Sequence, residues 1–468
     1  MSELVLFKNR RDDRPATFQE YRESGGYEAL IKAVKGLSPK EVRQRVLESG
    51  LRGRGGAGFP CGRKWDSIPD TAPFPRYILP NSDEMEPGTF KDRVLVNTDP
   101  HLVIEGIILA GYAVSAKKGI FFIRPSYELD AELIERELEV ARQEGFLGEN
   151  ILGSAFSFEI TVHRSGGRYI CGEASAQVNA IQGRRPNPRK GGPHLTEAGL
   201  WGRPTVVNNV ETLACVPHIL NRGAEWFRGL ARTKNGAGTK LYCVSGCVQQ
   251  PGCYELPMGT RLGEIIDHAA GGLVAGSEFK ACLPGGSSTP FMPRKFYDIA
   301  MDFDSMKEAG QRLGTGAIMV FDHKTCLVAA TINLIEYFTR ESCGWCTPCR
   351  EGLPYILELL QRIERGEGRE EYIMMIRTMA SHMDKAYCAF APGAAQSVLG
   401  LLNHFEAEVR EHISQKKCPF GMGERGLHPD DRWSRLDPRL RAVALGAGPR
   451  PRPRQGPVPG LVRAGLGR

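Results

Sequence analysis

Three cysteines, Cys343, Cys346 and Cys349, follow one another at C-x2-C-x2-C spacing. This spacing lets one tight loop direct three thiolates at a single inorganic centre, and Gly344 and Pro348 supply turns in its backbone. Thiolates suit either tetrahedral zinc or the irons of an iron–sulfur cubane. Three evenly spaced thiols favour a [4Fe-4S] cluster, because structural zinc sites usually come as two separated C-x2-C pairs.

A [4Fe-4S] cluster needs a fourth ligand, and the candidates downstream are Cys388 and Cys418. Cys418 precedes a proline, as the last cysteine of a bacterial ferredoxin motif does, but that cysteine follows after only three residues. We therefore favour Cys388. The remaining cysteines lack a further x2 spacing, so we expect them to be small buried apolar side chains: Cys61, Cys171, Cys215, Cys243, Cys247, Cys253, Cys282 and Cys326.

A glycine-rich loop, residues 53–59, is a second candidate site. Its glycines fit G-x-G-x-x-G, but in a Rossmann fingerprint this motif follows a strand, whereas here it follows a predicted helix that ends at Gly50. Small residues still let backbone N–H groups approach a phosphate or a flat ring. Arg54 and Lys64 add positive charge to a ligand site at this position. The alternative is a flexible surface loop.

Polar residues also cluster after predicted buried segments. Residues 81–86 carry three carboxylates directly after a predicted strand, where α/β proteins bind ligands. Residues 168–173 and 207–212 are similar in character. Asn208 and Asn209 can meet the edges of a flavin ring, but either can instead cap the helix that follows. Solvated turns and helix caps therefore remain alternatives for these segments.

Composition places the chain among globular proteins that function in a reducing compartment. Its 468 residues allow two to four domains. The formal net charge is +7, and residues 442–468 contribute five arginines and no acid, so the body shows no nucleic-acid-binding stripe. The odd number of cysteines, 13, argues against a secreted disulfide scaffold. We expect no membrane span and no signal or transit peptide.

The order of predicted elements indicates an α/β fold in several parts. Strands and helices alternate up to residue 238, a β-rich module follows over 239–326, and amphipathic helices occupy 327–415. The Pro-, Arg- and Gly-rich tail 416–468 is expected to be disordered. The helical part is predicted as a four-helix bundle with helices over 327–339, 352–365, 371–383 and 393–413.

Taken together, these motifs resemble the flavin-bearing, NADH-oxidising subunit of respiratory complex I, the bacterial NADH:quinone oxidoreductase (a translocase). The resemblance runs from about residue 21 to 412 and rests on residues 50–59, 81–92, 169–173, 183–189, 204–212 and 341–350. It implies a Rossmann-like FMN domain (1–238), a β-grasp (ubiquitin-like) domain (239–326) and a C-terminal four-helix bundle carrying the iron–sulfur cluster (327–415).

The resemblance also implies cofactors and their residues. FMN binds non-covalently, and the [4Fe-4S] ligands are Cys343, Cys346, Cys349 and Cys388. NADH stacks on the flavin, with Phe59 beside it, Glu86 near its ribose, and Glu84 and Glu173 tuning the site. No side chain is expected to act as a general acid or base. The other residues implied to contact FMN or NADH are Gly53, Arg54, Gly55, Gly56, Ala57, Gly58, Lys64, Asn81, Asp83, Tyr169, Gly172, Asn208, Asn209 and Thr212.

Two positions depart from the family pattern. Ala174 stands where the family has a second glutamate, whose carboxylate resembles those that repel a 2′-phosphate, and His194 stands where it has a phenylalanine that stacks on adenine. We therefore expect NADPH to be less strongly excluded here than in relatives.

Partners and location are implied by resemblance only. They are a thioredoxin-fold [2Fe-2S] subunit, a multi-cluster subunit of the peripheral arm, and a peripheral place on the cytoplasmic side of the bacterial inner membrane, with membrane contact only through the complex. The nearest alternative is the diaphorase subunit of a soluble NAD-linked hydrogenase or formate dehydrogenase. A complex I subunit is favoured, because such diaphorases often begin with a thioredoxin-like domain. A redox-inactive structural member and a zinc-binding scaffold are further alternatives.

Overall fold

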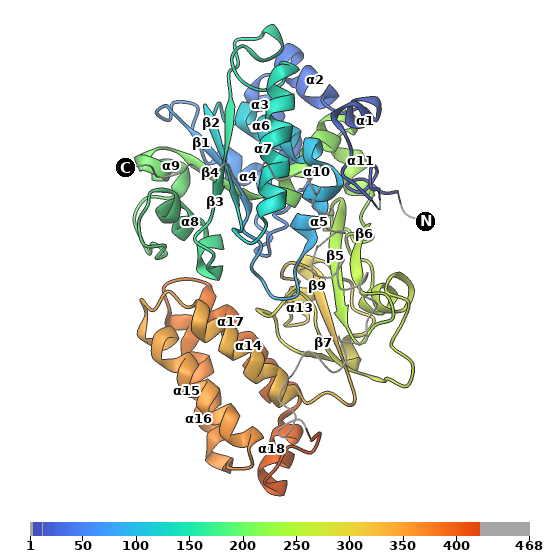
Figure 1. The fold of residues 1–468 in the computed structure, drawn as a ribbon, viewed down its shortest axis with the longest axis vertical. Coiled ribbons are helices and arrows are strands. Elements are labelled where there is room, and N and C mark those ends of the chain that lie inside the picture. Colours follow the sequence, from blue (N-terminus) through green and yellow to red (C-terminus); the bar gives the residue numbers. More distant parts are fainter. Residues whose placement is uncertain (1–2, 12, 422–468) are drawn as a thin grey trace, which may run out of the picture. The chain divides into compact units, whose positions relative to one another are not determined.

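A parallel sheet of four strands lies at the centre of the first part of the chain (Figure 1). The computed structural model describes residues 3–11 and 13–421, so most of the predicted disordered tail lies outside the described residues. The strand order is β3-β2-β1-β4, and each neighbouring pair is parallel. The strands are β1 (Tyr77–Ser82), β2 (Lys118–Ile123), β3 (Glu159–Arg164) and β4 (Thr205–Asn209).

Both faces of this sheet are covered, as its nearly continuous apolar strands require. Ile78 and Phe121 pack into one core, while Leu79 and Val207 pack on the opposite face against Val178 of α8. The second face carries α8 (Ala174–Ile181) and α9 (Leu195–Ala198). The helices of the first core are α1 (Phe18–Glu23), α2 (Glu28–Gly36), α3 (Pro39–Glu48), α4 (Cys61–Asp66), α5 (Lys91–Thr98), α6 (Pro100–Ala113), α7 (Glu128–Gln143), α10 (Val210–Arg222) and α11 (Ala224–Gly229).

Local sequence signals set the ends of several helices. Ser38 and Glu41 form a capping box at the start of α3. Asn209 caps α10 through its side-chain oxygen, so the helix-cap alternative for this residue is confirmed. Where α6 crosses α10, a Cβ on Gly106 would lie 2.2 Å from the Leu213 carbonyl oxygen, so this close crossing requires glycine.

A second sheet, of five strands in the order β6-β5-β9-β7-β8, follows in sequence. β5 and β6 form an antiparallel hairpin within the predicted β-rich module, whereas β5 and β9 are parallel. Tyr242, Leu262 and Ile318 belong to a core of its own. The elements are β5 (Thr239–Gly246), β6 (Gly252–Pro257), β7 (Phe279–Leu283), β8 (Met292–Pro293) and β9 (Ala317–Asp322), with α12 (Leu262–Glu264), a π-helical turn (Ile265–Ala269) and α13 (Phe303–Glu308).

The chain then continues as amphipathic helices that share a third core. The single helix predicted over 393–413 was wrong: the backbone leaves the helical region at Phe405, and its ring packs against the core, so two helices form. α15 begins earlier than predicted, because Pro348 suits a first helical turn. The helices are α14 (Leu327–Glu341), α15 (Thr347–Glu364), α16 (Glu370–Ser381), α17 (Phe390–His404) and α18 (Glu406–Gln415).

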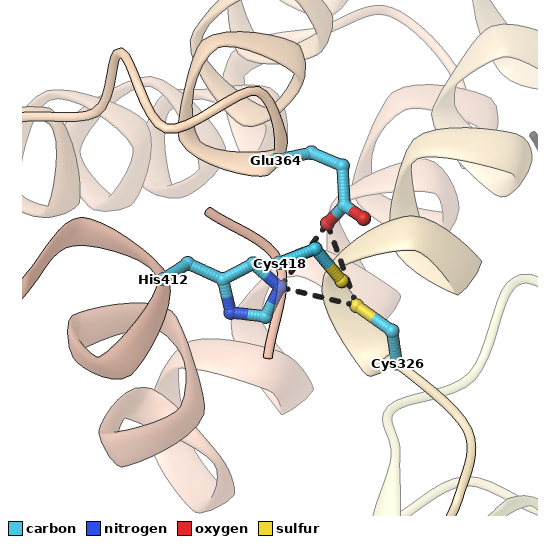
Figure 2. A group of neighbouring side chains, drawn as sticks. All are labelled: Cys326, Glu364, His412 and Cys418. Atoms are coloured by element: carbon cyan, nitrogen blue, oxygen red, sulfur yellow. Dashed lines mark hydrogen bonds and ion pairs between the residues drawn. The ribbon is translucent and has the colours of Figure 1, made fainter. Parts of the chain in front are cut away.

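Four polar side chains from separate segments meet where the second sheet leads into these helices (Figure 2). Cys326 precedes α14, Glu364 ends α15, His412 lies in α18, and Cys418 follows α18. Cys326 is buried in the apolar core of these helices as expected, but its sulfur also contacts the polar side chains of Glu364 and His412. Among the other cysteines expected to be buried, Cys247 is instead half-exposed.

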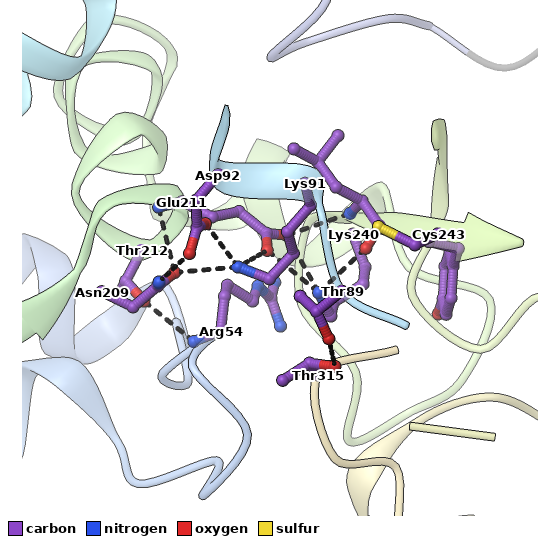
Figure 3. A network of polar contacts seen from close by, with 12 residues as sticks. Arg54, Thr89, Lys91, Asp92, Asn209, Glu211, Thr212, Lys240, Cys243 and Thr315 are labelled. Carbon is purple, nitrogen blue, oxygen red and sulfur yellow. Dashed lines mark hydrogen bonds and ion pairs between the residues drawn. The ribbon is translucent and has the colours of Figure 1, made fainter. Parts of the chain in front are cut away.

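A buried network of charges links the first core to β5 of the second sheet (Figure 3). Lys91 Nζ lies 2.6 Å from Asp92 Oδ1 and 3.0 Å from Glu211 Oε2, while Lys240 Nζ lies 2.9 Å from Glu211 Oε2. Asn209 Nδ2 donates to Asp92 Oδ2 at 2.7 Å. Burial opposes charge on Glu211, but the two lysines outweigh it and hold the pKa of this carboxyl below its usual value.

No single helix among the described residues is long and apolar enough to cross a membrane. Helices α5 and α6 together meet the criteria of length and composition, but they are bent by 102°. Almost every residue of α6 is buried inside the protein. A core helix satisfies the same test, so this pair is weak evidence for a span.

Replacing the central carboxylate of the buried network should destabilise the protein strongly. In Glu211→Gln, Lys240 loses its carboxylate partner and Lys91 keeps only Asp92, and breaking a buried ion pair costs about 3–5 kcal/mol. We expect a clearly lower urea midpoint in circular dichroism. The control, Glu139→Gln, removes an exposed partner of Arg142 and should change the free energy of unfolding by less than about 0.5 kcal/mol. Equal shifts in both variants would contradict this assignment.

Candidate functional site

The cysteines predicted to bind a cluster line one cavity. Cys346 precedes α15, Cys349 lies in its first turn, and Cys388 precedes α17. Gly344 has a φ of +74°, a left-handed conformation that lets the loop turn between Cys343 and Cys346. The cavity is lined by Cys343, Cys346, Cys349 and Cys388 together with Ile170, Ala386, Phe390 and Ala391. Cys418, the other candidate for fourth ligand, lies instead with Cys326.

The chemistry of this cavity suits a group that binds thiolates. Burial raises the pKa of the Cys349 thiol to about 12 and that of Cys388 to about 11. Without metal these thiols are neutral at physiological pH, so binding of iron releases protons. Ser342 Oγ lies 3.1 Å from Cys349 Sγ, and the Tyr387 N–H donates to Cys346 Sγ at 3.4 Å. Four sulfurs around an otherwise apolar cavity fit a [4Fe-4S] cluster.

A second constellation lies at the carboxyl ends of β1 and β4. The strand order places β2 on one side of β1 and β4 on the other, and ligands of open α/β sheets bind at such a reversal. Asn81 of β1 is aligned in register with Asn209 of β4. The glycine loop reaches the same edge, since a Cβ on Gly55 would lie 3.1 Å from Asn209 Cβ. The structure therefore brings together three of the predicted ligand segments.

Hydrogen bonds hold the glycine loop on its buried side, and part of its outer surface is exposed. The Arg54 N–H donates to Thr212 Oγ1 at 2.8 Å, and the buried Arg54 guanidinium donates to the carbonyls of Ala237 and Thr239. The Arg54 side chain thus braces the loop from inside rather than facing outward. A Cβ on Gly58 would lie 2.6 Å from the Phe303 ring, and its φ is +66°, so glycine is required there.

The exposed side of the loop carries the residues that a flat ligand can approach. Gly53 N–H bonds to the Phe59 carbonyl oxygen at 2.8 Å and closes the loop. Gly55 and Ala57 are exposed, Gly56 is half-exposed, and the Phe59 ring is 52% exposed. An exposed aromatic ring of this size beside small residues offers a stacking surface.

Asp83 and Gln177 flank Asn81 with unused hydrogen-bonding atoms. Asn81 Nδ2 donates to the Gly172 carbonyl oxygen at 3.0 Å and to Gln177 Oε1 at 3.1 Å, while its Oδ1 accepts from the Asp83 N–H. Ser165 Oγ donates to Asp83 Oδ1, but Asp83 Oδ2 and Gln177 Nε2 are buried without a partner among the described residues. An acceptor and a donor of this kind fit the polar edge and hydroxyl chain of a flavin nucleotide.

Sequence reasoning missed two members of this group. Gln177 and Ser165 carried no motif, and only their positions beside the 168–173 segment could have drawn attention to them. Burial raises the pKa of Asp83 to about 6, although the hydrogen bond from Ser165 opposes the shift.

Lys64 and the paired asparagines lie around the carboxyl end of β4. The constellation at the ends of β1 and β4 is named the strand-end crevice. Lys64 Nζ donates to the Val207 carbonyl oxygen at 2.9 Å, and burial lowers the pKa of this amine. Asn208 Oδ1 accepts from the Trp65 indole N–H at 2.9 Å. Asn209 is shared between the helix cap and Asp92. The two amides are therefore oriented by the protein itself.

The predicted glutamates occupy different surroundings. Glu84 is 5% exposed and accepts from the N–H groups of Asp92 and Arg93, so it lies at the start of α5 rather than beside the glycine loop. Glu86 accepts from the Ser288 N–H at 2.7 Å and is hydrogen-bonded to the Tyr169 hydroxyl. Burial raises the pKa of the Tyr169 phenol, so it stays a donor.

The two positions that depart from the family pattern lie on the far face of the sheet. Glu173 caps α8 by accepting from the Ser175 and Ala176 N–H groups, and Ala174 is the first residue of that helix, half-buried. His194 is exposed directly before α9, where its backbone N–H donates to Glu197.

The segment Tyr169–Gly172 connects the two constellations. Ile170 lines the cysteine cavity, while the Gly172 carbonyl oxygen is bonded to Asn81. The Tyr169 N–H donates to Glu341 Oε2 at 2.9 Å, directly before the cysteine loop, and its ring packs edge-on against Phe390 at 5.5 Å. One short turn therefore contacts both candidate cofactor sites.

Three family models match this chain. The Nuo51 FMN-binding domain matches residues 46–218, the SLBB domain matches 241–291, and the iron–sulfur binding region of NADH-ubiquinone oxidoreductase-F matches 329–412. The first contains the glycine loop and the strand-end crevice. The last contains all four cysteines of the cavity.

Similar proteins span most of the chain. The F 2 subunit of the NADH-quinone oxidoreductase of Rhizobium meliloti (strain 1021) is 45% identical over 421 residues, 90% of this chain and 100% of that relative. The F subunit of the Escherichia coli (strain K12) NADH-quinone oxidoreductase is 44% identical over 437 residues, covering 92% and 97%. The solved structure of an NAD+-reducing [NiFe]-hydrogenase in the air-oxidized state matches with a TM-score of 0.75 and 32% identity, over 87% of this chain and 68% of that chain.

The buried Glu84 should make stability depend on pH. Burial and the neighbouring Asp92 raise the pKa of Glu84 to about 8, above the ordinary value of 4.5. Between these values the folded state binds a proton that the unfolded state has released, so stability falls as pH rises, by up to about 1.4 kcal/mol per pH unit. Urea midpoints measured from pH 5 to 8 should fall less steeply in Glu84→Gln. An unchanged slope would show that Glu84 is ionised in the folded protein.

Proposed function

The chain belongs to the family of NADH-quinone oxidoreductase F subunits, and from that premise we propose which of its residues hold the cofactors and how they are coupled. It is an oxidoreductase that oxidises NADH and uses FMN and a [4Fe-4S] cluster. When bound, FMN accepts electrons from NADH as a hydride and releases them singly, which matches the one-electron capacity of an iron–sulfur cluster.

The observation that carries the proposal is the turn Tyr169–Gly172, which lies between the crevice and the cysteine cavity. Its Gly172 carbonyl orients Asn81, and its Ile170 side chain lines the cavity. Cofactors held in these two places are separated by a single turn of packed chain. Such a short separation supports direct transfer of electrons between them. Cys343, Cys346, Cys349 and Cys388 supply the cluster thiolates.

Some residues of the crevice bind FMN directly, and others keep the surrounding segments in position. The unpartnered oxygen of Asp83 accepts a hydrogen bond from a hydroxyl group of FMN, and Asn81, Gly172 and Gln177 complete that edge. Lys64 supplies positive charge for the phosphate, and Asn208 lies beside it. The remaining wall is formed by the glycine loop, Asn209 and Thr212. Arg54 acts by bracing that loop.

NADH is placed on the exposed side of the glycine loop. Phe59 offers its ring for stacking, and Glu86, oriented by Ser288 and Tyr169, lies nearest the ribose. Glu84 and Glu173 act on the site through the helices that they cap, α5 and α8. No side chain serves as a general acid or base, because the transferred group is a hydride. The protein's task is to align the two rings and to exclude water.

The finer architecture is part of the proposal. Residues 1–238 form the Rossmann-like FMN domain, and 239–326 form a β-grasp domain, which the mixed five-stranded sheet around β5 and β9 supports. Residues 327–415 form the cluster-binding bundle, whose shared core supports a four-helix arrangement of α14 to α17. The tail is assigned to 416–468.

The partners and location are also proposals. As a subunit of a multi-subunit complex, the chain contacts a thioredoxin-fold [2Fe-2S] subunit and a multi-cluster subunit, on the cytoplasmic side of the inner membrane. The hydrogenase similarity supports a diaphorase of a soluble enzyme as the second candidate. Subunits that co-purify with the native chain decide between the two.

Separate variants should remove each cofactor independently. Cys388→Ala should abolish the electron paramagnetic resonance signal of the reduced cluster and quinone reduction, while FMN and NADH:ferricyanide activity remain. Asp83→Asn should keep the iron but weaken FMN binding about 10- to 100-fold, because a charge-assisted hydrogen bond is worth about 1.5–3 kcal/mol. Cys282→Ala, which changes another buried cysteine, is the control. Full cluster content in Cys388→Ala would contradict the ligand assignment.

A carboxylate at the start of α8 should increase the preference for NADH over NADPH. Ala174→Glu should raise the ratio of kcat/KM for NADH over NADPH by about tenfold, since repulsion of a 2′-phosphate worth about 1.4 kcal/mol has that effect. Steady-state kinetics with both nucleotides measure the ratio. Gln182→Glu adds the same charge directly after α8 and should leave it unchanged. If the ratio is unaltered in Ala174→Glu, residue 174 does not face the ribose.

A further inference from the structure

Cys326, Glu364, His412 and Cys418 form a polar cluster inside the C-terminal helices (Figure 2). Cys326 and His412 are fully buried, and Cys418 is 8% exposed. One ligand atom from each side chain lies within 4.8 Å of the other three. Cysteine, histidine and carboxylate are the side chains that bind zinc in proteins.

Three distances between these ligand atoms match the edges of a coordination tetrahedron. Cys326 Sγ lies 3.3 Å from His412 Nε2 and 3.4 Å from Glu364 Oε2, and the latter two atoms are 3.2 Å apart. Zinc bonds of about 2.0–2.3 Å place tetrahedral ligand atoms about 3.3–3.8 Å apart. Cys326, His412 and Glu364 are therefore already spaced for one ion, and Cys418 Sγ lies within 4.8 Å of their ligand atoms.

Neighbouring backbone groups prepare two of these side chains for a cation. His412 Nδ1 lies 2.7 Å from the Glu408 carbonyl oxygen, to which it must donate, so Nε2 presents its lone pair toward the cluster. The Ala329 N–H donates to Cys326 Sγ at 3.3 Å, at the N-terminus of α14. This hydrogen bond favours the thiolate that a metal requires, whereas burial and the nearby Glu364 raise the pKa of the Cys326 thiol, so the thiolate depends on a bound cation.

A purely hydrogen-bonded cluster would leave part of this group unsatisfied. His412 and Glu364 can form an ion pair, but Glu364 Oε1 is buried without a partner among the described residues. Placing two thiols, a carboxylate and an imidazole together in the interior is unfavourable unless their polar atoms are used. A divalent cation uses all four at once.

We propose that these four side chains bind a structural zinc ion. All four coordination positions come from the protein, as in structural rather than catalytic zinc sites. The ion ties the residues after α18 to the end of α15 and the start of α14. It is distinct from the cysteine cavity, because Glu364 follows Cys349 by 15 residues of α15, a distance of about 22 Å along the helix axis. It takes no part in the oxidation of NADH.

Metal analysis tests this proposal independently of the redox cofactors. Both the unsubstituted holoenzyme and Cys418→Ala are purified with EDTA and without added zinc. Cys418→Ala should contain one zinc atom per FMN fewer than the unsubstituted protein. Its iron and FMN contents should stay constant, which shows that the variant folds. X-ray absorption at the zinc edge of the purified chain should show two sulfur neighbours at about 2.3 Å and two nitrogen or oxygen neighbours at about 2.0–2.1 Å.

A second variant and a matched control complete the test. Cys326→Ser retains an atom that can cap α14, so loss of zinc in this variant cannot be ascribed to loss of the cap. Cys282→Ala, in the second sheet, should keep its zinc. Equal zinc contents in all of these proteins, or a disulfide between Cys326 and Cys418 in the native chain, would overturn the proposal.

Discussion

The buried charges of Lys91, Glu211 and Lys240 constrain the geometry of the whole ligand crevice. Glu211 is fully buried and bonds both lysines, which come from α5 and β5 (Figure 3). It lies in α10, the helix that Asn209 caps. Desolvated charges cannot separate without a large penalty, so the helix, the strand and the strand-end crevice are held in one arrangement. The position of the glycine loop follows, through the bond from Arg54 to Thr212.

The two candidate cofactor sites differ in polarity and lie on either side of the turn Tyr169–Gly172. The crevice offers amides, a carboxylate and an amine for a polar nucleotide, whereas the cavity offers sulfur among apolar side chains. Tyr169 is bonded to Glu86 on one side and to Glu341 on the other. Both carboxylates belong to segments that also carry candidate ligands, so Tyr169 links the two candidate sites by direct contact.

Short-range patterns in the sequence predicted much of this arrangement. The cysteine triplet and the capping box of α3 both depend on neighbouring residues, and the triplet lines one cavity with Cys388 in the structure. Contacts set by the tertiary fold could not be read in this way. Gln177 and Lys240 contact their partners only when distant segments pack together. The helix break at Phe405 likewise depends on the packing of its ring against the core. Glu364, His412 and Cys418, which lie beside Cys326 in the structure, are likewise far from it in the sequence.

The network around Glu211 also bears on how the protein is made. Lys91 and Glu211 emerge from the ribosome before Lys240, which belongs to the first strand of the second sheet. Until that strand appears, the nascent chain carries a buried carboxylate without its full complement of partners. The N-terminal portion therefore cannot complete this network of ion pairs until residue 240 is available to it.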